Sequence, residues 1–259
     1  KNESMQTDSL FRRVFEMAVN IAKETDGAFD PTIAPVVNFW GFGFEEIPQK
    51  DENKLADLMK TTGYEKLTIQ DRLIVKSNPN TQIDFNAIAQ GFTVDLIAEY
   101  LQKSSITNYM IEIGGELKCR GLNADGKLWR IGIDKPSENI QQNRFQAIIE
   151  VPNKAIASSG NYRKFKIDEK RGTKYAHTID PKTGKPVQTN LLSVTMVSES
   201  CMQADALATA CMVMGVEKSI EFINSKPELD ALIIYSGPKG EWLQHQTEGF
   251  KKMSVYQSK

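Results

Sequence analysis

The chain has 259 residues, a net charge of −1, 40% hydrophobic residues and 25% charged residues, which are ordinary values for one large globular domain or two small ones. The near-neutral charge argues against general binding to nucleic acid or to a membrane surface, and no apolar run is long enough to span a bilayer. Two histidines and three cysteines without Cys-x-x-Cys spacing exclude a His-rich metal cluster, a zinc site and a disulfide framework.

The first predicted element is an amphipathic helix over Thr7–Thr25, where apolar residues recur every three to four positions before Asp26-Gly27. A shaped loop or short helix, rich in proline, glycine and aromatic residues, is expected over Gly27–Gly43. The elements expected next are a helix over Lys54–Thr61, a hairpin with strands Lys66–Gln70 and Leu73–Lys76, a short strand over Ile83–Phe85, and a helix over Ala87–Gln102.

Strands dominate the following stretch, and short loops with regularly spaced turns favour antiparallel pairing. The strands are expected at Tyr109–Ile113, Glu116–Arg120, Trp129–Asp134, Phe145–Val151, Ala155–Ser158, Tyr162–Lys166 and Leu192–Val197. Helices over Ser200–Gly215 and Val216–Ser225 and a strand over Ala231–Tyr235 come after them. Without repeats or low-complexity linkers, the pattern predicts a single α+β domain over residues 1–259, with an antiparallel sheet core flanked by helices.

The helix over Ser200–Gly215 is apolar almost all round, which is typical of a helix buried in a core. Asp205 and Thr209 are four residues apart within it and therefore share one face. A carboxylate in an apolar setting needs compensation, and Mg²⁺ coordinated by that carboxylate, a hydroxyl and a carbonyl or phosphate oxygen would provide it. The alternative is that Asp205 complements the helix dipole in the first turn while Thr209 bonds back to its own turn.

In Ile83–Phe92 a predicted strand passes into a helix through small residues, so backbone groups there can approach a ligand closely. The N–H groups at such a helix start suit phosphate. Neither a P-loop nor a Rossmann glycine pattern is present. The alternative is that Asp84 or Asn86 simply caps a core helix.

The segment His177–Gly184 contains one of the two histidines and an Asp-Pro-Lys-Thr-Gly turn. The turn could bring the Asp180 carboxylate back toward His177, and such a pair suits general-base chemistry. A lone histidine is nevertheless more often a structural residue. The segment Ala157–Tyr162 lacks a nucleophile-elbow pattern, so we interpret it as a turn that lines the pocket. Ile113–Glu116 is either a Gly-Gly hairpin turn or a point of close backbone approach.

Five of these blocks occur in one order along the chain: Gly27-Ala-Phe-Asp-Pro-Thr, Asp84-Phe-Asn-Ala-Ile-Ala-Gln-Gly, Ile113-Gly-Gly-Glu, His177-Thr-Ile-Asp-Pro-Lys-Thr-Gly and Ala204-Asp-Ala-Leu-Ala-Thr-Ala. Each block is weakly specific alone, but the ordered set across roughly Ser9–Tyr235 resembles the ApbE family of FAD:protein FMN transferases. The resemblance implies an ApbE-like α+β fold, of which a T-fold-like arrangement is one form.

The family resemblance implies Mg²⁺-dependent transfer of FMN from FAD onto a Thr or Ser hydroxyl of an acceptor protein, with release of AMP. By motif position, the implied Mg²⁺ ligands are Asp205, Thr209 and the backbone carbonyl of Ala89. The implied flavin-binding residues are Ala28, Phe29, Asp30, Asn86, Phe92 and Ile179. His177 and Asp180 are the candidates for deprotonating the acceptor hydroxyl, and which of them is the base stays open.

The resemblance further implies acceptors that carry an Asp-x-Ser/Thr-Gly-Ala-Ser/Thr motif, such as subunits of ion-pumping oxidoreductases. It implies a location on the periplasmic side of a bacterial inner membrane, with a lipid anchor. We expect the sequence to lack the N-terminal strand and targeting segment of the family. Gln90 stands where relatives often have Lys, which removes one positive charge near the phosphates. The alternatives are a Mg²⁺-dependent FAD pyrophosphatase that produces FMN and AMP, and a flavin-binding module without catalysis.

Overall fold

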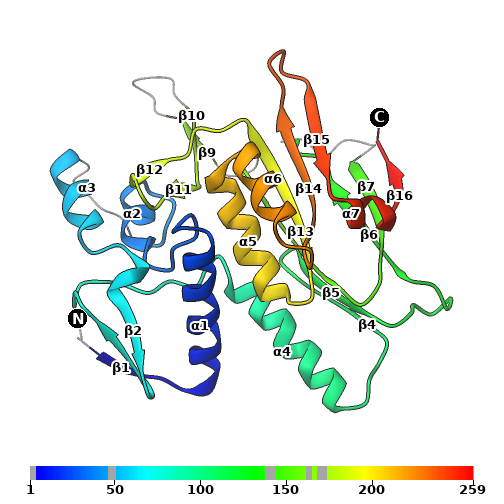
Figure 1. The fold of residues 1–259 in the computed structure, drawn as a ribbon, viewed down its shortest axis with the longest axis horizontal. Coiled ribbons are helices and arrows are strands. Elements are labelled where there is room, and N and C mark those ends of the chain that lie inside the picture. Colours follow the sequence, from blue (N-terminus) through cyan, green and yellow to red (C-terminus); the bar gives the residue numbers. More distant parts are fainter. Residues whose placement is uncertain (1–3, 46–50, 138–143, 162–164, 168–173, 259) are drawn as a thin grey trace. The chain divides into compact units, whose positions relative to one another are not determined.

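The computed structural model describes residues 4–45, 51–137, 144–161, 165–167 and 174–258 (Figure 1). The chain divides into two units, each of which is described separately. Unit 1 comprises Lys1–Asn86 and Phe165–Gln188, and unit 2 comprises Ala87–Lys164 and Thr189–Lys259. Among the described helices, none combines the length and the apolar character needed to cross a bilayer.

Unit 2 is built on a six-stranded antiparallel sheet with the order β15-β14-β13-β8-β5-β4. Its strands are β4 (Tyr109–Ile113), β5 (Glu116–Arg120), β8 (Ala155–Gly160), β13 (Leu191–Ser198), β14 (Asp230–Ser236) and β15 (Trp242–Gln246). A second antiparallel sheet has the order β16-β7-β6, with strands β6 (Trp129–Asp134), β7 (Phe145–Val151) and β16 (Ser254–Gln257). The sequence-predicted strands of this unit therefore form, with end points that move by one or two residues.

The larger core of unit 2 lies between its two sheets, where side chains from both meet Phe250 of α7 (Glu248–Met253). Alternate residues on the six-stranded sheet point the other way, so that Ala155 of β8 joins a second cluster with Val94 and Cys201. These two residues belong to α4 (Ala89–Lys103) and α5 (Cys201–Met214), and α6 (Val216–Asn224) follows directly (Figure 1). Apolar residues therefore fill both faces of the sheet, which explains why β13 is buried along nearly its whole length.

Close packing of α4 against α5 depends on a glycine. A Cβ atom at Gly91 would lie 2.4 Å from the carbonyl oxygen of Cys201, a distance that no ordinary side chain tolerates. The first turn of α4 consequently lies directly against the first turn of α5. This contact determines which groups surround the polar residues of α5.

In unit 1, α1 (Ser9–Glu24) packs on a three-stranded antiparallel sheet with the order β1-β3-β2 through Phe15, Leu67 and Ile74. The strands are β1 (Ser4–Gln6), β2 (Leu67–Gln70) and β3 (Leu73–Lys76). The remaining elements are α2 (Ala34–Phe39), α3 (Glu52–Met59), a 3₁₀ turn (Tyr64–Lys66), and the strand pairs β9 (Phe165–Ile167) with β10 (Lys174–Ala176) and β11 (Ile179–Asp180) with β12 (Lys185–Pro186).

The predicted α+β class with antiparallel sheets is confirmed, whereas two local predictions are wrong. Ile83–Phe85 is not a strand, because its backbone bonds to a loop instead: Asp84 N–H donates to the carbonyl of Pro31 (2.7 Å). Ala157–Gly160 continues β8 and is not a turn; Tyr162 lies outside the described residues. The short elements β1, β11, β12 and α7 were not predicted, because such short segments carry too little hydrophobic periodicity.

Candidate active site

Asp205 lies in the second turn of α5 and is buried, with only 6% of its surface exposed. The first turn of this helix contains no acidic residue, so the interpretation of Asp205 as a first-turn complement to the dipole of α5 is wrong. Its Oδ2 atom instead accepts a hydrogen bond from the backbone N–H of Gly91 in α4 (3.1 Å). Asp205 therefore connects α5 to the start of α4.

The start of α4 lacks a side-chain cap from its own segment. Ile88 occupies the N-cap position and makes no capping hydrogen bond through its side chain. The Asp84 carboxylate accepts from the backbone N–H and the side-chain amide of Asn86 (2.9 and 3.1 Å), so the prediction that Asp84 or Asn86 caps this helix is wrong. Because the first N–H groups of a helix have no partner within it, Asp205 satisfies one of them from outside.

Two further oxygen atoms belong to the same part of unit 2. Thr209 follows Asp205 by one turn of α5, is partly exposed, and its Oγ1 atom lies 3.3 Å from Oγ of Ser159 on β8. Ala89 is the first residue of α4, and its carbonyl accepts a hydrogen bond from the hydroxyl of Thr93 (2.8 Å). A carboxylate, a hydroxyl and a carbonyl are the oxygen donors that Mg²⁺ prefers.

The electrostatics of this region also suit a cation. Burial raises the pKa of Asp205 to about 6, and the hydrogen bond from Gly91 opposes that shift only in part. Burial and the charge of Asp205 raise the pKa of Glu116, at the start of β5, to about 7. Within the described residues, neither carboxylate forms an ion pair with Lys or Arg, and no group of three His, Cys, Asp or Glu side chains could hold a metal by itself. A bound Mg²⁺ would therefore also need oxygen atoms from a substrate or from water.

The raised pKa of Asp205 predicts that the metal-free protein loses stability as the pH rises. The folded state holds this proton more tightly than the unfolded chain, whose pKa is near 3.8. The associated stability is fully present below about pH 4 and is lost as the pH passes through about 6. It amounts to roughly 3 kcal/mol. Denaturant unfolding in EDTA between about pH 4 and pH 7 should show a steeper loss of stability for the parent than for Asp205→Asn. Equal slopes would contradict the prediction.

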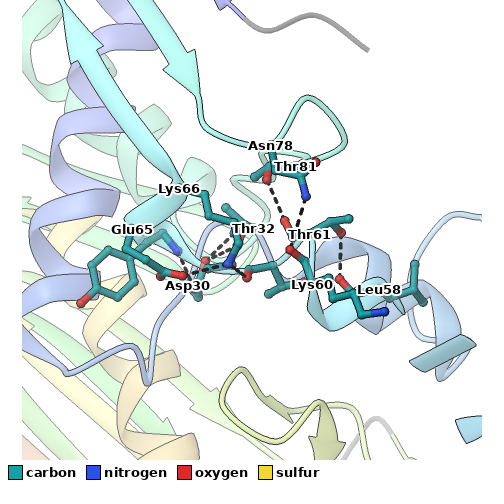
Figure 2. Close-up of polar contacts among 12 residues, drawn as sticks. Asp30, Thr32, Leu58, Lys60, Thr61, Glu65, Lys66, Asn78 and Thr81 are labelled. Carbon is teal, nitrogen blue, oxygen red and sulfur yellow. Dashed lines mark hydrogen bonds and ion pairs between the residues drawn. The ribbon is translucent and has the colours of Figure 1, made fainter. Parts of the chain in front are cut away.

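In unit 1, Asp30 organises a buried polar network rather than facing solvent (Figure 2). Its Oδ1 accepts from the backbone N–H and the hydroxyl of Thr32 (2.8 and 2.6 Å), and its Oδ2 accepts from the N–H of Tyr64 (2.9 Å). Burial raises its pKa, and these hydrogen bonds partly offset that rise. The Thr32 hydroxyl also accepts from the N–H of Gly63 (2.7 Å). Asp30 thus shapes the loop that carries Ala28 and Phe29, and a direct contact of its carboxylate with flavin stays a prediction.

The segment His177–Gly184 forms the predicted turn beside this loop. Asp180 stabilises the turn, because its Oδ1 accepts from the N–H of Lys182 (2.9 Å) and its Oδ2 from the hydroxyl of Thr183 (2.9 Å). The carbonyl of Gly184 accepts from the indole N–H of Trp40 (2.7 Å).

Further contacts bring the same two segments of unit 1 together. Lys182 forms an ion pair with Asp26, and the ring of His177 contacts the ring of Phe42 edge-on, with a centroid distance of 6.5 Å. The structure therefore brings the Gly27–Gly43 segment and the His177–Gly184 segment next to each other, as their joint assignment to one pocket requires.

The remaining predicted flavin contacts differ in exposure. Ala28, Phe29, Ile179 and Phe92 are buried, whereas Asn86 is exposed. The predicted site residues divide between the units: Ala28, Phe29, Asp30, Asn86, His177, Ile179 and Asp180 lie in unit 1, and Ala89, Phe92, Asp205 and Thr209 lie in unit 2. Within each unit the structure groups them as described above.

A cavity of about 860 Å³ in unit 1 is lined by residues such as Phe11, Pro35, Leu58, Ile74 and Ile83. None of the predicted site residues lines it. Its charged lining residues are Lys54, Asp57 and Lys76, and the ammonium of Lys76 is already bound to the carbonyls of Pro79 and Thr81. The carboxylate and hydroxyl groups of unit 2 are therefore the stronger indication of a reactive centre.

Sequence reasoning missed roles for Glu116 and Ser159. The sequence places Glu116 in a segment that is either a glycine turn or a point of close backbone approach, and Ser159 in a turn predicted to line the pocket. No local signal could reveal either role, since each depends on residues far away in the sequence. His245 is half-buried on β15, and its buried Nε2 atom has no hydrogen-bond partner among the described residues.

Comparison with known proteins identifies relatives along most of the chain. The model of the ApbE family matches residues 1–233. The FAD:protein FMN transferase of Vibrio cholerae is 41% identical over 240 residues, which are 92% of this chain and 70% of that protein. The FAD:protein FMN transferase of Haemophilus influenzae is 37% identical over 259 residues, covering 98% of this chain and 73% of that protein. The solved structure of the flavin transferase ApbE from Vibrio cholerae has a TM-score of 0.86 at 39% identity, covering 98% of this chain and 79% of that one.

Proposed function

The chain belongs to the ApbE family, and from this premise we propose that it transfers FMN from FAD to a Thr or Ser hydroxyl of an acceptor protein and releases AMP. The observation in this chain that carries the proposal is the buried Asp205, held at the start of α4 and followed one turn later by Thr209. Burying a carboxylate is unfavourable, and a divalent cation bound by this carboxylate and the neighbouring oxygen atoms would offset that cost.

The proposed reaction breaks the phosphoanhydride bond of FAD and forms a phosphate ester bond to the acceptor. The acceptor oxygen attacks the phosphorus on the FMN side of the FAD pyrophosphate, the bond to AMP breaks, and the hydroxyl proton passes to a base. Asp205, Thr209 and the Ala89 carbonyl would hold Mg²⁺, which when bound neutralises charge on the pyrophosphate. The backbone N–H groups at the start of α4 would orient phosphate oxygens.

We propose His177 rather than Asp180 as the base. Both carboxylate oxygens of Asp180 already accept hydrogen bonds from the turn that follows it, so its role is to shape that turn. Histidine is the side-chain type best suited to proton transfer near neutral pH. Ala28, Phe29, Ile179 and Phe92 would supply the apolar surface for the flavin, with Asp30 and Asn86 supporting the loops beside them.

The family resemblance also supports a proposal for the acceptor protein and for the cellular location. The acceptor would carry an Asp-x-Ser/Thr-Gly-Ala-Ser/Thr motif, as subunits of ion-pumping oxidoreductases do. The protein would act on the periplasmic side of a bacterial inner membrane, with a lipid anchor.

The test is flavin fluorescence in a denaturing gel after incubation of the protein with FAD and an acceptor bearing that motif. We expect a fluorescent acceptor band that forms with Mg²⁺ and disappears with EDTA. An acceptor whose Thr or Ser is replaced by Ala serves as the control and should stay dark. A dark acceptor with AMP released would indicate hydrolysis of FAD, and a dark acceptor without AMP would indicate flavin binding alone.

A further inference from the structure

Glu116 is a buried carboxylate with an unused oxygen. It begins β5 directly after the turn formed by Gly114 and Gly115, which both have positive φ angles (65° and 110°). Only 7% of the residue is exposed, and its Oε2 atom has no hydrogen-bond partner among the described residues. Because an unpaired buried carboxylate is costly, this oxygen calls for a ligand that the bare chain does not contain.

The position of this oxygen connects Glu116 with the start of α4. A Cβ atom built on Gly114 would lie 3.5 Å from Oε2 of Glu116 and 2.0 Å from Nε2 of Gln90. The side chains of Glu116 and Gln90 thus both reach the space that a Cβ atom of residue 114 would fill. This space is open because residue 114 is a glycine. Gln90 directly precedes Gly91, whose N–H binds Asp205. Glu116 and Asp205 therefore approach the same turn of α4 from different elements.

No cation of unit 2 compensates this pair of carboxylates among the described residues. Lys118 follows Glu116 by two positions and so lies on the same face of β5, but its ammonium binds Asp95 (2.6 Å) and the carbonyl of Glu199 (3.0 Å). The other charged group that acts on Glu116 is Glu112, which is also negative. Two buried acids that interact with each other and lack a partner of opposite charge favour a divalent cation between them.

We propose that the Glu116 carboxylate is a second acidic group that binds the divalent cation held at Asp205. This inference rests on the proposed function, since it assumes the cation site at Asp205. Mg²⁺ sites in proteins commonly use one or two carboxylates, with substrate phosphate oxygens and water completing the coordination. Glu116 binds the cation either directly or through one of these waters.

The test measures binding of Mn²⁺, a paramagnetic ion with the same preference for six oxygen ligands, to the whole chain without flavin. The free Mn²⁺ signal in electron paramagnetic resonance gives the affinity directly. We expect Glu116→Gln to weaken binding about tenfold or more. Asp205→Asn should weaken it further, and Glu116→Asp should retain part of the affinity. Glu221→Gln is the control, because Glu221 is an exposed acid on α6 and is not among the charges that act on Glu116.

Thermal unfolding in EDTA separates a binding effect from a folding defect. Glu116→Gln should be at least as stable as the parent, because it removes an unpaired buried charge, and Mn²⁺ should raise its midpoint less. Parent-like Mn²⁺ affinity in Glu116→Gln, with affinity lost in Asp205→Asn, would overturn the role of Glu116 and leave the proposed function standing. Parent-like affinity in both variants, or no saturable binding by the parent, would overturn the cation site itself.

Discussion

Asp205→Asn is expected to reduce FMN transfer by at least about a hundredfold while making the metal-free protein more stable. A neutral amide is a poor substitute for the carboxylate that would bind Mg²⁺, and losing even a group that only orients a metal ligand typically costs about 10–100-fold. Because the buried charge disappears, the free energy of unfolding in EDTA near pH 8 should rise by up to about 3 kcal/mol.

Two measurements on the same variant make this prediction specific. Acceptor flavinylation is followed by in-gel fluorescence, and stability is followed by denaturant unfolding. The Asn side-chain oxygen can still accept from Gly91 N–H, so the junction between α4 and α5 should persist. Glu221→Gln removes an exposed acid on α6 and should change neither quantity. Transfer at the parent rate would contradict the cation site, and lower stability would contradict the view that the Asp205 charge is costly in the metal-free protein.

Asp95→Ala is expected to destabilise the fold by about 3–5 kcal/mol, the range for breaking one side of a buried ion pair. Asp95 lies on α4 and is buried, with its Oδ1 bound to the ammonium of Lys118 (2.6 Å). Its Oδ2 accepts from the hydroxyl of Ser200 (2.7 Å) and from the N–H of Met202 (3.0 Å) at the start of α5. The substitution would leave Lys118 unpaired and remove a partner from the first turn of α5.

A double variant distinguishes the lost ion pair from a general packing defect. Replacing Lys118 by Met in the Asp95→Ala background removes the unpaired ammonium, so part of the lost stability should return. The thermal midpoint of Asp95→Ala should fall by roughly 10 °C, since about 1 kcal/mol corresponds to roughly 2–4 °C in a chain of this size. A loss below about 1 kcal/mol, or no recovery in the double variant, would contradict the importance of this ion pair.

The sequence by itself was sufficient for the family, the fold class and most regular elements. The five ordered blocks are contiguous stretches, so their recognition needs no knowledge of long-range contacts. The α1 and α5 helices follow from apolar patterning and local caps: Asp8 and Ser200 accept from Phe11 N–H and Gln203 N–H, as their positions before each helix predict. The Asp205 and Thr209 pair likewise follows from the four-residue spacing of one helix face.

The tertiary structure alone decided how those residues are used. From local patterns, Asp84 and Asn86 were only alternative candidates for the cap of α4, and Asp205 instead binds its first turn from a position 114 residues away from Gly91. The unused oxygen of Glu116 and the contact between Ser159 and Thr209 arise in the same way. The physical reason is that local patterns determine which backbone conformation a segment adopts, whereas the partner of a buried polar group depends on which elements pack against it.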